Sequence, residues 1–221
     1  MAISNVYNMD CMEYMKDIPD KFFDLAIVDP PYGIDKAFTP PSRISKYGQT
    51  ITTNDNKPNK AYFDELFRVS QNQIIFGYNH LSDMLPKCKE FIFWYKHQPV
   101  VSYADGELAW TSFQKSAKCF DYPFFGNINA EKGRIHPMQK PIALYHWILK
   151  NYGKEGFKIL DTHLGGGSSR IAAYKLGFDF YATEIDRTYF DDQEKRFRQE
   201  CFGEQVLPSG KKIIQTSLFQ H

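Results

Sequence analysis

The stretch KILDTHLGGGSSRIAAYKLGFDFYATEID, residues 158–186, decides the fold. An apolar segment leads into an acid and three consecutive glycines, and a helical segment at 168–176 follows. A second apolar segment at 178–183 ends at Glu184. A strand, a glycine-rich turn, a helix and a strand with an acid at its tip are typical of a Rossmann-like nucleotide-binding unit. The stretch therefore predicts two neighbouring parallel strands that are joined through a helix.

The details of this unit indicate which nucleotide fits it. Glu184 follows Gly165 at about the spacing at which an acid binds ribose hydroxyls. Arg170 stands where a dinucleotide motif has its third glycine, and no Gly-Lys-Ser/Thr sequence follows to hold phosphates. A carboxylate at Asp161 can pair with an ammonium group. S-adenosylmethionine offers an ammonium group and a ribose but no phosphate, so it is the predicted ligand; a plain tight turn is the alternative.

A second constellation, Asp29-Pro30-Pro31-Tyr32, follows directly after the apolar run FDLAIV of residues 23–28. Two prolines cannot continue a strand ladder, so the strand ends there. The amine of an aromatic base is a weak nucleophile because its lone pair is delocalised into the ring. A carboxylate and a fixed carbonyl can accept both amine hydrogens, and a tyrosine can stack on a base that has left the duplex. The motif predicts chemistry on a base amine; a strand-ending turn is the alternative.

Apolar runs and helical patterns alternate along the chain. Strands are predicted at 23–28, 73–76, 90–95, 107–112, 158–160 and 178–183, and helices at 11–18, 62–70, 81–85, 142–151, 168–176 and 188–200. Residues 35–60 and 113–140 lack such patterns and are predicted to be irregular. The alternation predicts an α/β fold with a mostly parallel sheet and helices on both faces.

Composition excludes several classes of protein. A chain of 221 residues with 43% hydrophobic and 24% charged residues suits one globular α/β domain. No apolar run approaches the roughly 18 residues of a membrane span, and the first ten residues do not resemble a signal peptide. The four cysteines are far apart and form no C-x-x-C pair, which argues against a zinc site and disulfides. We expect a cytoplasmic protein without membrane or metal partners.

Positive charge gathers locally although the net charge is only +1. Residues 36–60 hold five basic residues against Asp55 alone, and residues 115–140 hold five against two acids. Such clusters suit a DNA backbone, and solvated loops are the alternative. The residues predicted to contact DNA are Lys36, Arg43, Lys46, Lys115, Lys118 and Arg134.

Together, these motifs resemble the amino-group DNA methyltransferases. VDPPYG at 28–33 resembles their catalytic motif, DTHLGGGSS at 161–169 resembles their cofactor motif, and HPMQKP at 136–141 is similar to their H-P-T-Q-K-P segment. The catalytic motif comes first, as in the circularly permuted beta class. The resemblance implies a Rossmann-like S-adenosylmethionine-dependent methyltransferase fold. Because Asp rather than Ser stands at position 29, it also implies adenine-N6 rather than cytosine-N4 as the target, in a bacterial or phage setting that includes restriction-modification.

The resemblance also implies roles for individual residues. Asp29, Pro30, Pro31 and Tyr32 act on the base. The residues that hold the cofactor are Asp10, Cys11, Lys140, Asp161, His163, Gly165, Gly167, Ser168 and Glu184. Glu107 and Trp110 are expected to be structural. His163 departs from the aromatic residue usual at its position, and we expect it to pack on the cofactor.

The predicted organisation is one methyltransferase domain over residues 1–221. It comprises a catalytic half at about 1–112, a target-recognition segment at about 113–135 and a cofactor-binding half at about 136–221. The middle segment is too short for a separate DNA-reading domain. Double-stranded DNA would therefore be read by loops, loosely, or with a second copy in a homodimer or a separate recognition subunit. A cytosine-N4 target, an RNA or protein-amide substrate, and a cofactor-binding subunit without activity are the alternatives.

Overall fold

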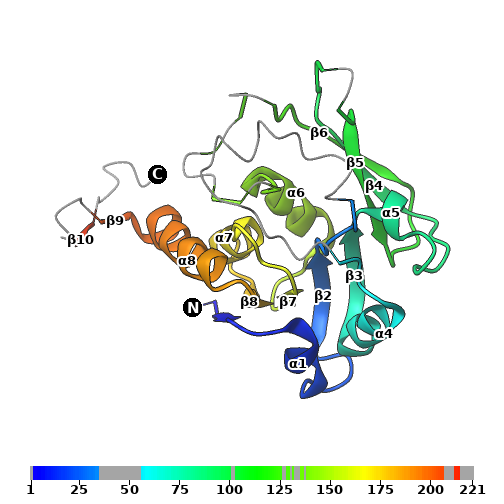
Figure 1. Ribbon diagram of the computed structural model, residues 1–221, viewed down its shortest axis with the longest axis horizontal. Coiled ribbons are helices and arrows are strands. Elements are labelled where there is room, and N and C mark those ends of the chain that lie inside the picture. Colours follow the sequence, from blue (N-terminus) through cyan, green and yellow to red (C-terminus); the bar gives the residue numbers. More distant parts are fainter. Residues whose placement is uncertain are drawn as a thin grey trace.

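Within the residues that the structure describes, eight strands form one sheet in the order β1-β8-β7-β2-β3-β5-β4-β6 (Figure 1). The computed structural model describes residues 2–34, 56–100, 103–125, 128–129, 131, 135–136, 138–206 and 212–214. The strands of the sheet are β1 (Ser4–Tyr7), β2 (Phe23–Val28), β3 (Ser70–Phe76), β4 (Phe91–Tyr95), β5 (Gly106–Thr111), β6 (Lys118–Asp121), β7 (Lys158–Asp161) and β8 (Asp179–Thr183). Outside the sheet, β9 (Glu204–Val206) pairs with β10 (Lys212–Ile214).

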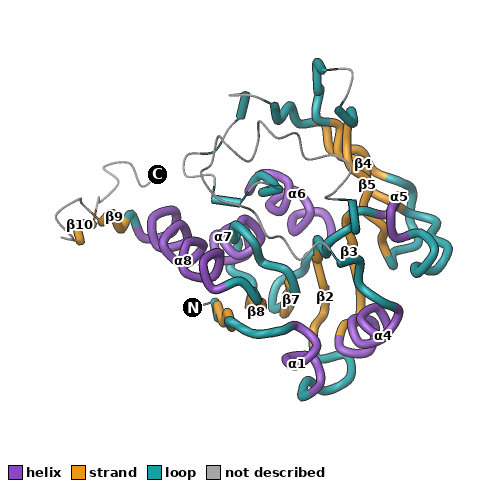
Figure 2. Tube along the Cα trace, in the orientation of Figure 1, coloured by secondary structure: helices purple, strands orange, loops and turns teal. Residues whose placement is uncertain are grey.

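Helices flank the central strands on two sides (Figure 2). Those described are α1 (Cys11–Lys16), α4 (Lys60–Val69), α5 (Tyr78–Leu81), α6 (Ile142–Tyr152), α7 (Ser168–Lys175) and α8 (Arg187–Phe202). Alternate residues of β2 pack on opposite faces, as the pleat of a strand requires. Leu25 and Ile27 join the core under α6 and α7, whereas Ala26 and Val28 join the core under α1 and α4. The continuous apolar run at 23–28 is thus explained by burial on both faces.

The sheet is mostly parallel, as predicted. β1, β8, β7, β2 and β3 run in parallel, and β5 runs antiparallel to both of its neighbours, β3 and β4. Because β5 reverses the chain between two strands of the same direction, the carboxyl ends of β2, β3, β4, β7 and β8 meet at one edge. The predicted α/β class and Rossmann-like architecture are confirmed.

Two strands of the sheet are not predicted from the sequence. β1 is an edge strand whose residues alternate between exposed and half-buried, so its sequence SNVY carries little apolar signal. β6 falls inside the segment 113–140 that lacks a regular pattern, and it forms the opposite edge. An edge strand is paired on one side only, which makes its sequence less distinctive.

The helix predicted at 81–85 is wrong. α5 spans Tyr78–Leu81 and begins directly after Gly77, whose φ of 78° lets the chain reverse after β3. It does not reach residue 85 because Pro86 disfavours helical geometry in the residue before it. Pro19 likewise disfavours helical geometry at Ile18, the predicted end of the first helix, and α1 ends at Lys16 with Asp17 as its C-cap.

Candidate active site at the carboxyl ends of the central strands

The two predicted motifs lie side by side at the point where the order of the strands in the sheet reverses. β2 and β7 are neighbours and parallel, with Ala26 opposite Leu160. From β7 the chain continues through α7 to β8 on one side, and from β2 it continues through α4 to β3 on the other. In open α/β sheets ligands bind at such a switch point, outside the carboxyl ends of the strands. Asp161 ends β7 and Asp29 follows β2, so both acids lie at this point.

Asp161 is a buried carboxylate held by uncharged donors. The Ser169 hydroxyl donates to Asp161 Oδ2 over 2.6 Å, and the backbone N–H of His163 donates to Oδ1 over 3.0 Å. Burial raises the pKa of Asp161 to about 7, and the largest opposing effects come from these two neutral donors and not from a cation. A buried negative charge without a positive partner is costly, and a cationic ligand would relieve that cost. The site therefore suits an ammonium group.

Glu184 points at the glycine loop from the tip of β8. Its Oε2 accepts from the Gly165 N–H over 2.8 Å and its Oε1 accepts from the Asp186 N–H over 2.9 Å. Burial raises the pKa of the Glu184 carboxyl group. Each carboxylate oxygen keeps a further lone pair. Glu184 is thus fixed in place with acceptor capacity left for the two hydroxyls of a ribose.

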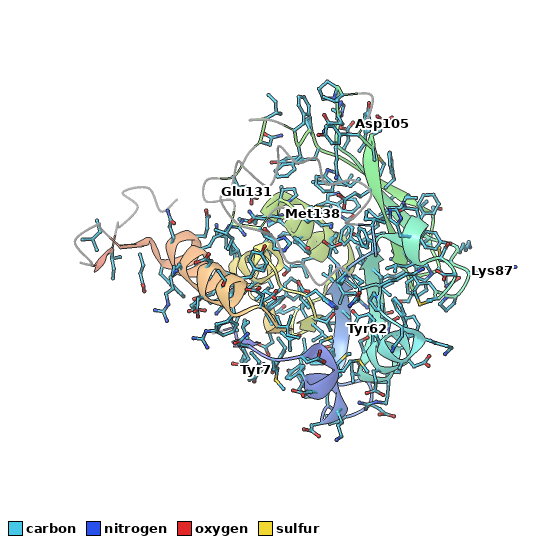
Figure 3. The ribbon with its side chains drawn as sticks, viewed as in Figure 1. Tyr7, Tyr62, Lys87, Asp105, Glu131 and Met138 are labelled. Atoms are coloured by element: carbon cyan, nitrogen blue, oxygen red, sulfur yellow. The ribbon has the colours of Figure 1, made fainter. Side chains whose placement is uncertain are left out.

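The glycine loop is held in place by side chains that are not predicted from the sequence. Arg196 of α8 donates to the Gly166 carbonyl, and to the Ser168 hydroxyl over 3.0 Å. A Cβ on Gly166 would come within 2.4 Å of Gln139 Oε1, so a larger residue here would force the Gln139 side chain to move. Arg196 also pairs over 2.6 Å with Glu131 (labelled in Figure 3), which ties the loop to the segment that leads into α6. The sequence does not distinguish Arg196 from the other charged residues of α8, and only the structure shows that it is buried.

The remaining cofactor candidates border the same end of β7. Asp10 caps α1 by accepting from the Met12 N–H over 2.7 Å. Burial raises the pKa of the Cys11 thiol to about 12, so it stays protonated at neutral pH. Burial lowers the pKa of His163 to about 4, and the neutral ring shares a 2.9 Å hydrogen bond with Thr162, which in turn bonds Tyr62 (labelled in Figure 3). His163 is therefore a packed, uncharged histidine.

The predicted catalytic motif, Asp29–Tyr32, forms a compact cluster after β2. The Tyr32 hydroxyl donates to Asp29 Oδ1, and the Tyr32 ring stacks on His80 with centroids 5.4 Å apart. A Cβ on Gly77 would lie 2.1 Å from the Tyr32 ring, so only glycine lets the ring approach this closely. Gly77 and His80 lie beside the motif because β3 is the parallel neighbour of β2. Neither residue is predicted from the sequence.

Lys140 lies against Asp29, which the sequence does not predict. Its Nζ forms an ion pair with Asp29 Oδ2 and lies 3.1 Å from Glu107 Oε2. Burial opposes the charge of Lys140, but the two carboxylates raise its pKa above the usual value. Burial likewise opposes the charge of Glu107, but Lys140 and Lys96 lower its pKa to about 2. A charged residue in the apolar strand GELAWT was the available signal, because a buried charge needs a partner.

The structure does not bring the described DNA-contact candidates to this site. Lys118 begins β6 and therefore lies at the edge of the sheet opposite to Asp29, and exposed Lys115 precedes it. Both stay predictions. Lys36, Arg43, Lys46 and Arg134 lie outside the described residues. Over the part of the chain that is described, no group of three His, Cys, Asp or Glu side chains could hold a metal ion. No helix in those ranges is long and apolar enough to cross a membrane.

Several known proteins resemble this chain in sequence. The profile of the DNA methylase family (N6_N4_Mtase) matches residues 72–195. Type II methyltransferase M.HinfI of Haemophilus influenzae is 22% identical over 89% of this chain and 69% of its own length. Type II methyltransferase M.ScaI of Streptomyces caespitosus is 22% identical over 89% of this chain and 82% of its own length.

Solved structures share the fold. The M1.HpyAVI–SAM complex superposes with a TM-score of 0.59 at 22% identity, covering 87% of this chain and 98% of that one. PvuII DNA methyltransferase, which is cytosine-N4-specific, superposes with a TM-score of 0.58 at 13% identity, covering 89% and 87%. The predicted cofactor, S-adenosylmethionine, is confirmed with the family. The family profile spans more than half of the chain, and the chain belongs to the DNA methylase family of S-adenosylmethionine-dependent N6/N4 methyltransferases.

Proposed function

We propose that the chain methylates the N6 amine of an adenine in double-stranded DNA after the base has left the duplex. One observation carries the proposal. Asp29, followed by two prolines and Tyr32, stands at the same switch point as Asp161 of the cofactor motif, on the neighbouring parallel strand. This arrangement sets an acceptor for an amine next to a carboxylate that suits a cationic cofactor.

The residues at the ends of β7 and β8 fit S-adenosylmethionine. The buried carboxylate of Asp161 would pair with the ammonium group, and Glu184 would accept the ribose hydroxyls. Gly165 and Gly167, both with positive φ, let the backbone pass close to the ligand. Asp10 and Cys11 at the start of α1, together with His163, would border the cofactor from the neighbouring elements.

Asp29 and the Pro30 carbonyl would accept hydrogen bonds from the two amine hydrogens. These bonds would reduce the delocalisation of the nitrogen lone pair into the ring and direct the lone pair toward the methyl group. S-adenosylmethionine supplies the methyl group, and the new C–N bond forms as the C–S bond breaks with its electron pair left on sulfur. The methylated amine then carries a positive charge and loses one proton, to solvent or transiently to Asp29. Positioning and charge placement supply most of the acceleration.

Tyr32 would supply the surface on which the base stacks. Its hydroxyl donates to Asp29 Oδ1, the oxygen that an amine hydrogen would also use. We therefore propose that the base amine takes the place of the tyrosine hydroxyl when the ring turns to stack on the base.

Cytosine-N4 is the second candidate, because the fold is shared with a cytosine-N4-specific enzyme and one pair of acceptors serves either amine. Asp at position 29 favours adenine by resemblance only. A binding subunit without activity is less well supported, since both the Asp29 cluster and the Glu184 contacts are intact. DNA would be read by loops, loosely, or with a second copy or a recognition subunit, and the circular permutation of the motifs stays a prediction.

The test is transfer of labelled methyl groups to mixed-sequence duplex DNA, with the product nucleoside identified by mass spectrometry. We expect N6-methyladenine from the wild type and none from Asp29→Ala that still binds the cofactor. N4-methylcytosine would replace the proposal by its second candidate. Bound cofactor without any product would favour a subunit that needs a partner or a substrate other than DNA.

A further inference from the structure

We propose that Lys140 and Glu107 are positioning residues for Asp29, rather than a cofactor ligand and a structural strand residue. The proposal rests on the proposed function. Lys140 fixes the carboxylate that accepts the base amine, and Glu107, itself anchored by Lys96, fixes Lys140. The three residues come from the segment before α6, from β5 and from near the end of β4, so distant parts of the chain converge on one carboxylate.

The contacts form a row of alternating charges. Lys140 Nζ pairs with Asp29 Oδ2 and lies 3.1 Å from Glu107 Oε2, while Glu107 Oε1 pairs with Lys96. Register across β4 and β5 sets Glu107 opposite Trp94, and Lys96 Nζ lies 4.7 Å from the Trp94 ring centroid. Two negative and two positive groups balance, so the row adds no net charge to the interior.

The row is largely shielded from water. Only 5% of the Lys140 side chain is exposed, against 18% for Asp29 and 22% for Glu107. The Lys140 ammonium also lies 4.7 Å from the Phe76 ring centroid. Burying a lysine is costly, and replacing buried ion pairs by apolar residues often leaves a fold equally stable. A buried lysine directly against the amine acceptor is therefore better explained by the acceptor than by the fold.

Lys140 divides the two oxygens of Asp29 between two tasks. It occupies Oδ2, whereas Oδ1 accepts from the Tyr32 hydroxyl. Because Lys140 holds Oδ2, Oδ1 keeps its orientation when the Tyr32 hydroxyl moves away and the base amine takes its place. Among the described residues, Asp161 on β7 interacts with Asp29 as a second carboxylate, and Glu107 on β5 shares the Lys140 ammonium with it. The neutral groups that also face Asp29 are His163, Tyr62 and Tyr145. Without Lys140, like-charge repulsion would turn Asp29 away from the amine.

The experiment separates this role from cofactor binding. Lys140→Met and Lys140→Arg are compared with wild type and with Lys175→Met, a control that removes an exposed lysine paired with Glu200 on α8. Calorimetry gives the dissociation constant of S-adenosylhomocysteine, and single-turnover kinetics at saturating cofactor give the transfer rate to duplex DNA.

We expect Lys140→Met to lower the transfer rate by about 10²-fold, the usual effect of displacing a reacting group by about 1 Å. The dissociation constant should change by less than about threefold. Lys140→Arg should recover part of the rate because it restores the cation, and Lys175→Met should match wild type. A tenfold loss of cofactor affinity with an unchanged rate at saturation would make Lys140 a cofactor ligand and overturn the proposal.

A second variant pair guards against a purely structural role. Lys140→Met leaves Glu107 with one cation fewer, so the melting temperature of this variant should be lower than that of the wild type. Adding Glu107→Gln removes the unbalanced charge and should restore stability, but the transfer rate should stay low. Recovery of the rate together with the melting temperature would show that the row serves only the fold.

A measurement of stability tests the pairing independently of the reaction. A double-mutant cycle of Asp29→Asn and Lys140→Met should show coupling of at least fivefold in the unfolding equilibrium constant, because the two groups are in contact. Absent coupling would overturn the proposal even if the wild type methylates DNA. Conversely, coupling without any methylation of DNA would contradict the proposed function and leave the pairing established.

Discussion

The carboxylates in the two halves of the site have different hydrogen-bond and ion-pair partners. Asp161 and Glu184, on the cofactor side, are held by N–H and O–H donors, and burial raises the pKa of both. Asp29 and Glu107, on the base side, are balanced by Lys140 and, for Glu107, by Lys96. Asp161, which we propose receives the cationic group of the cofactor, is held by neutral donors. Asp29, which we propose accepts hydrogens from a neutral amine, has its charge compensated by Lys140.

The largest expected effect is on the base side. Asp29→Asn keeps the size of the side chain but loses the charge and replaces one acceptor oxygen by a donor. We expect the transfer rate to fall by about 10²–10³-fold, comparable to the loss of one preorganised hydrogen bond in other active sites. The dissociation constant of S-adenosylhomocysteine should stay within about threefold of wild type. Transfer at the wild-type rate would remove Asp29 from the mechanism.

The next effect is on the cofactor side and has two opposite parts. Asp161→Asn should weaken cofactor binding by about 10–100-fold, because the cationic group loses its buried partner. The same variant should be more stable than wild type at pH 8. Burial holds the folded-state pKa of Asp161 at about 7, above its value of roughly 4 in an unfolded chain, so its unfavourable contribution appears as the pH rises from about 4 through 7.

The size of that stability gain has an upper limit. A shift of about three pKa units corresponds to at most about 4 kcal/mol, to be seen at pH 8 and absent below pH 4. Urea unfolding at both pH values measures it. Equal destabilisation at the two pH values would mean that Asp161 serves the fold and was not left without a cation for a ligand.

Cofactor affinity should also depend on pH. A cationic ligand binds the deprotonated form of Asp161, so affinity should rise with pH up to about 7, by at most tenfold per pH unit. His163 is not expected to contribute to this rise, because burial lowers its pKa to about 4. Calorimetry between pH 5.5 and 7 measures the slope. Asp161→Asn should flatten it, and a slope that persists in the variant would assign the titration to another group.

A smaller effect tests how Tyr32 is held. Gly77→Ala would bring a methyl group within 2.1 Å of the Tyr32 ring, in addition to the backbone strain of a φ of 78°. Gly156→Ala is the matched control, since its φ is 82° and nothing lies within 4 Å of the added carbon. Both variants should lose about 1 kcal/mol of stability from backbone strain. Only Gly77→Ala should also lower the transfer rate. Equal transfer rates in the two variants would show that the position of the Tyr32 ring does not matter for the reaction.

The cofactor half could be predicted further from the sequence than the base half. The glycine loop, Asp161 and Glu184 lie within one strand–helix–strand unit, so their spacing along the chain fixes their spacing in space. The residues around the Asp29–Tyr32 motif come instead from separate elements: Gly77 after β3 lies against Tyr32, Lys140 before α6 pairs with Asp29, and Glu107 on β5 pairs with Lys140. A local pattern cannot reveal such contacts. Only the single acid Glu107 within an otherwise apolar strand indicated that a partner lies elsewhere in the chain.

Cysteine chemistry provides the smallest predicted effect and a check on both halves. Cys11 begins α1 beside Asp10, and burial and the Asp10 charge raise its thiol pKa to about 12. A thiol that stays protonated at neutral pH is a poor nucleophile, and direct transfer to an amine needs no covalent enzyme intermediate. Cys11→Ser should therefore keep the transfer rate within about threefold of wild type. Loss of single-turnover transfer with an unchanged melting temperature and cofactor affinity would mean that the thiol takes part in the reaction. The chemistry would then depend on Cys11 and not on the charge-balanced Asp29.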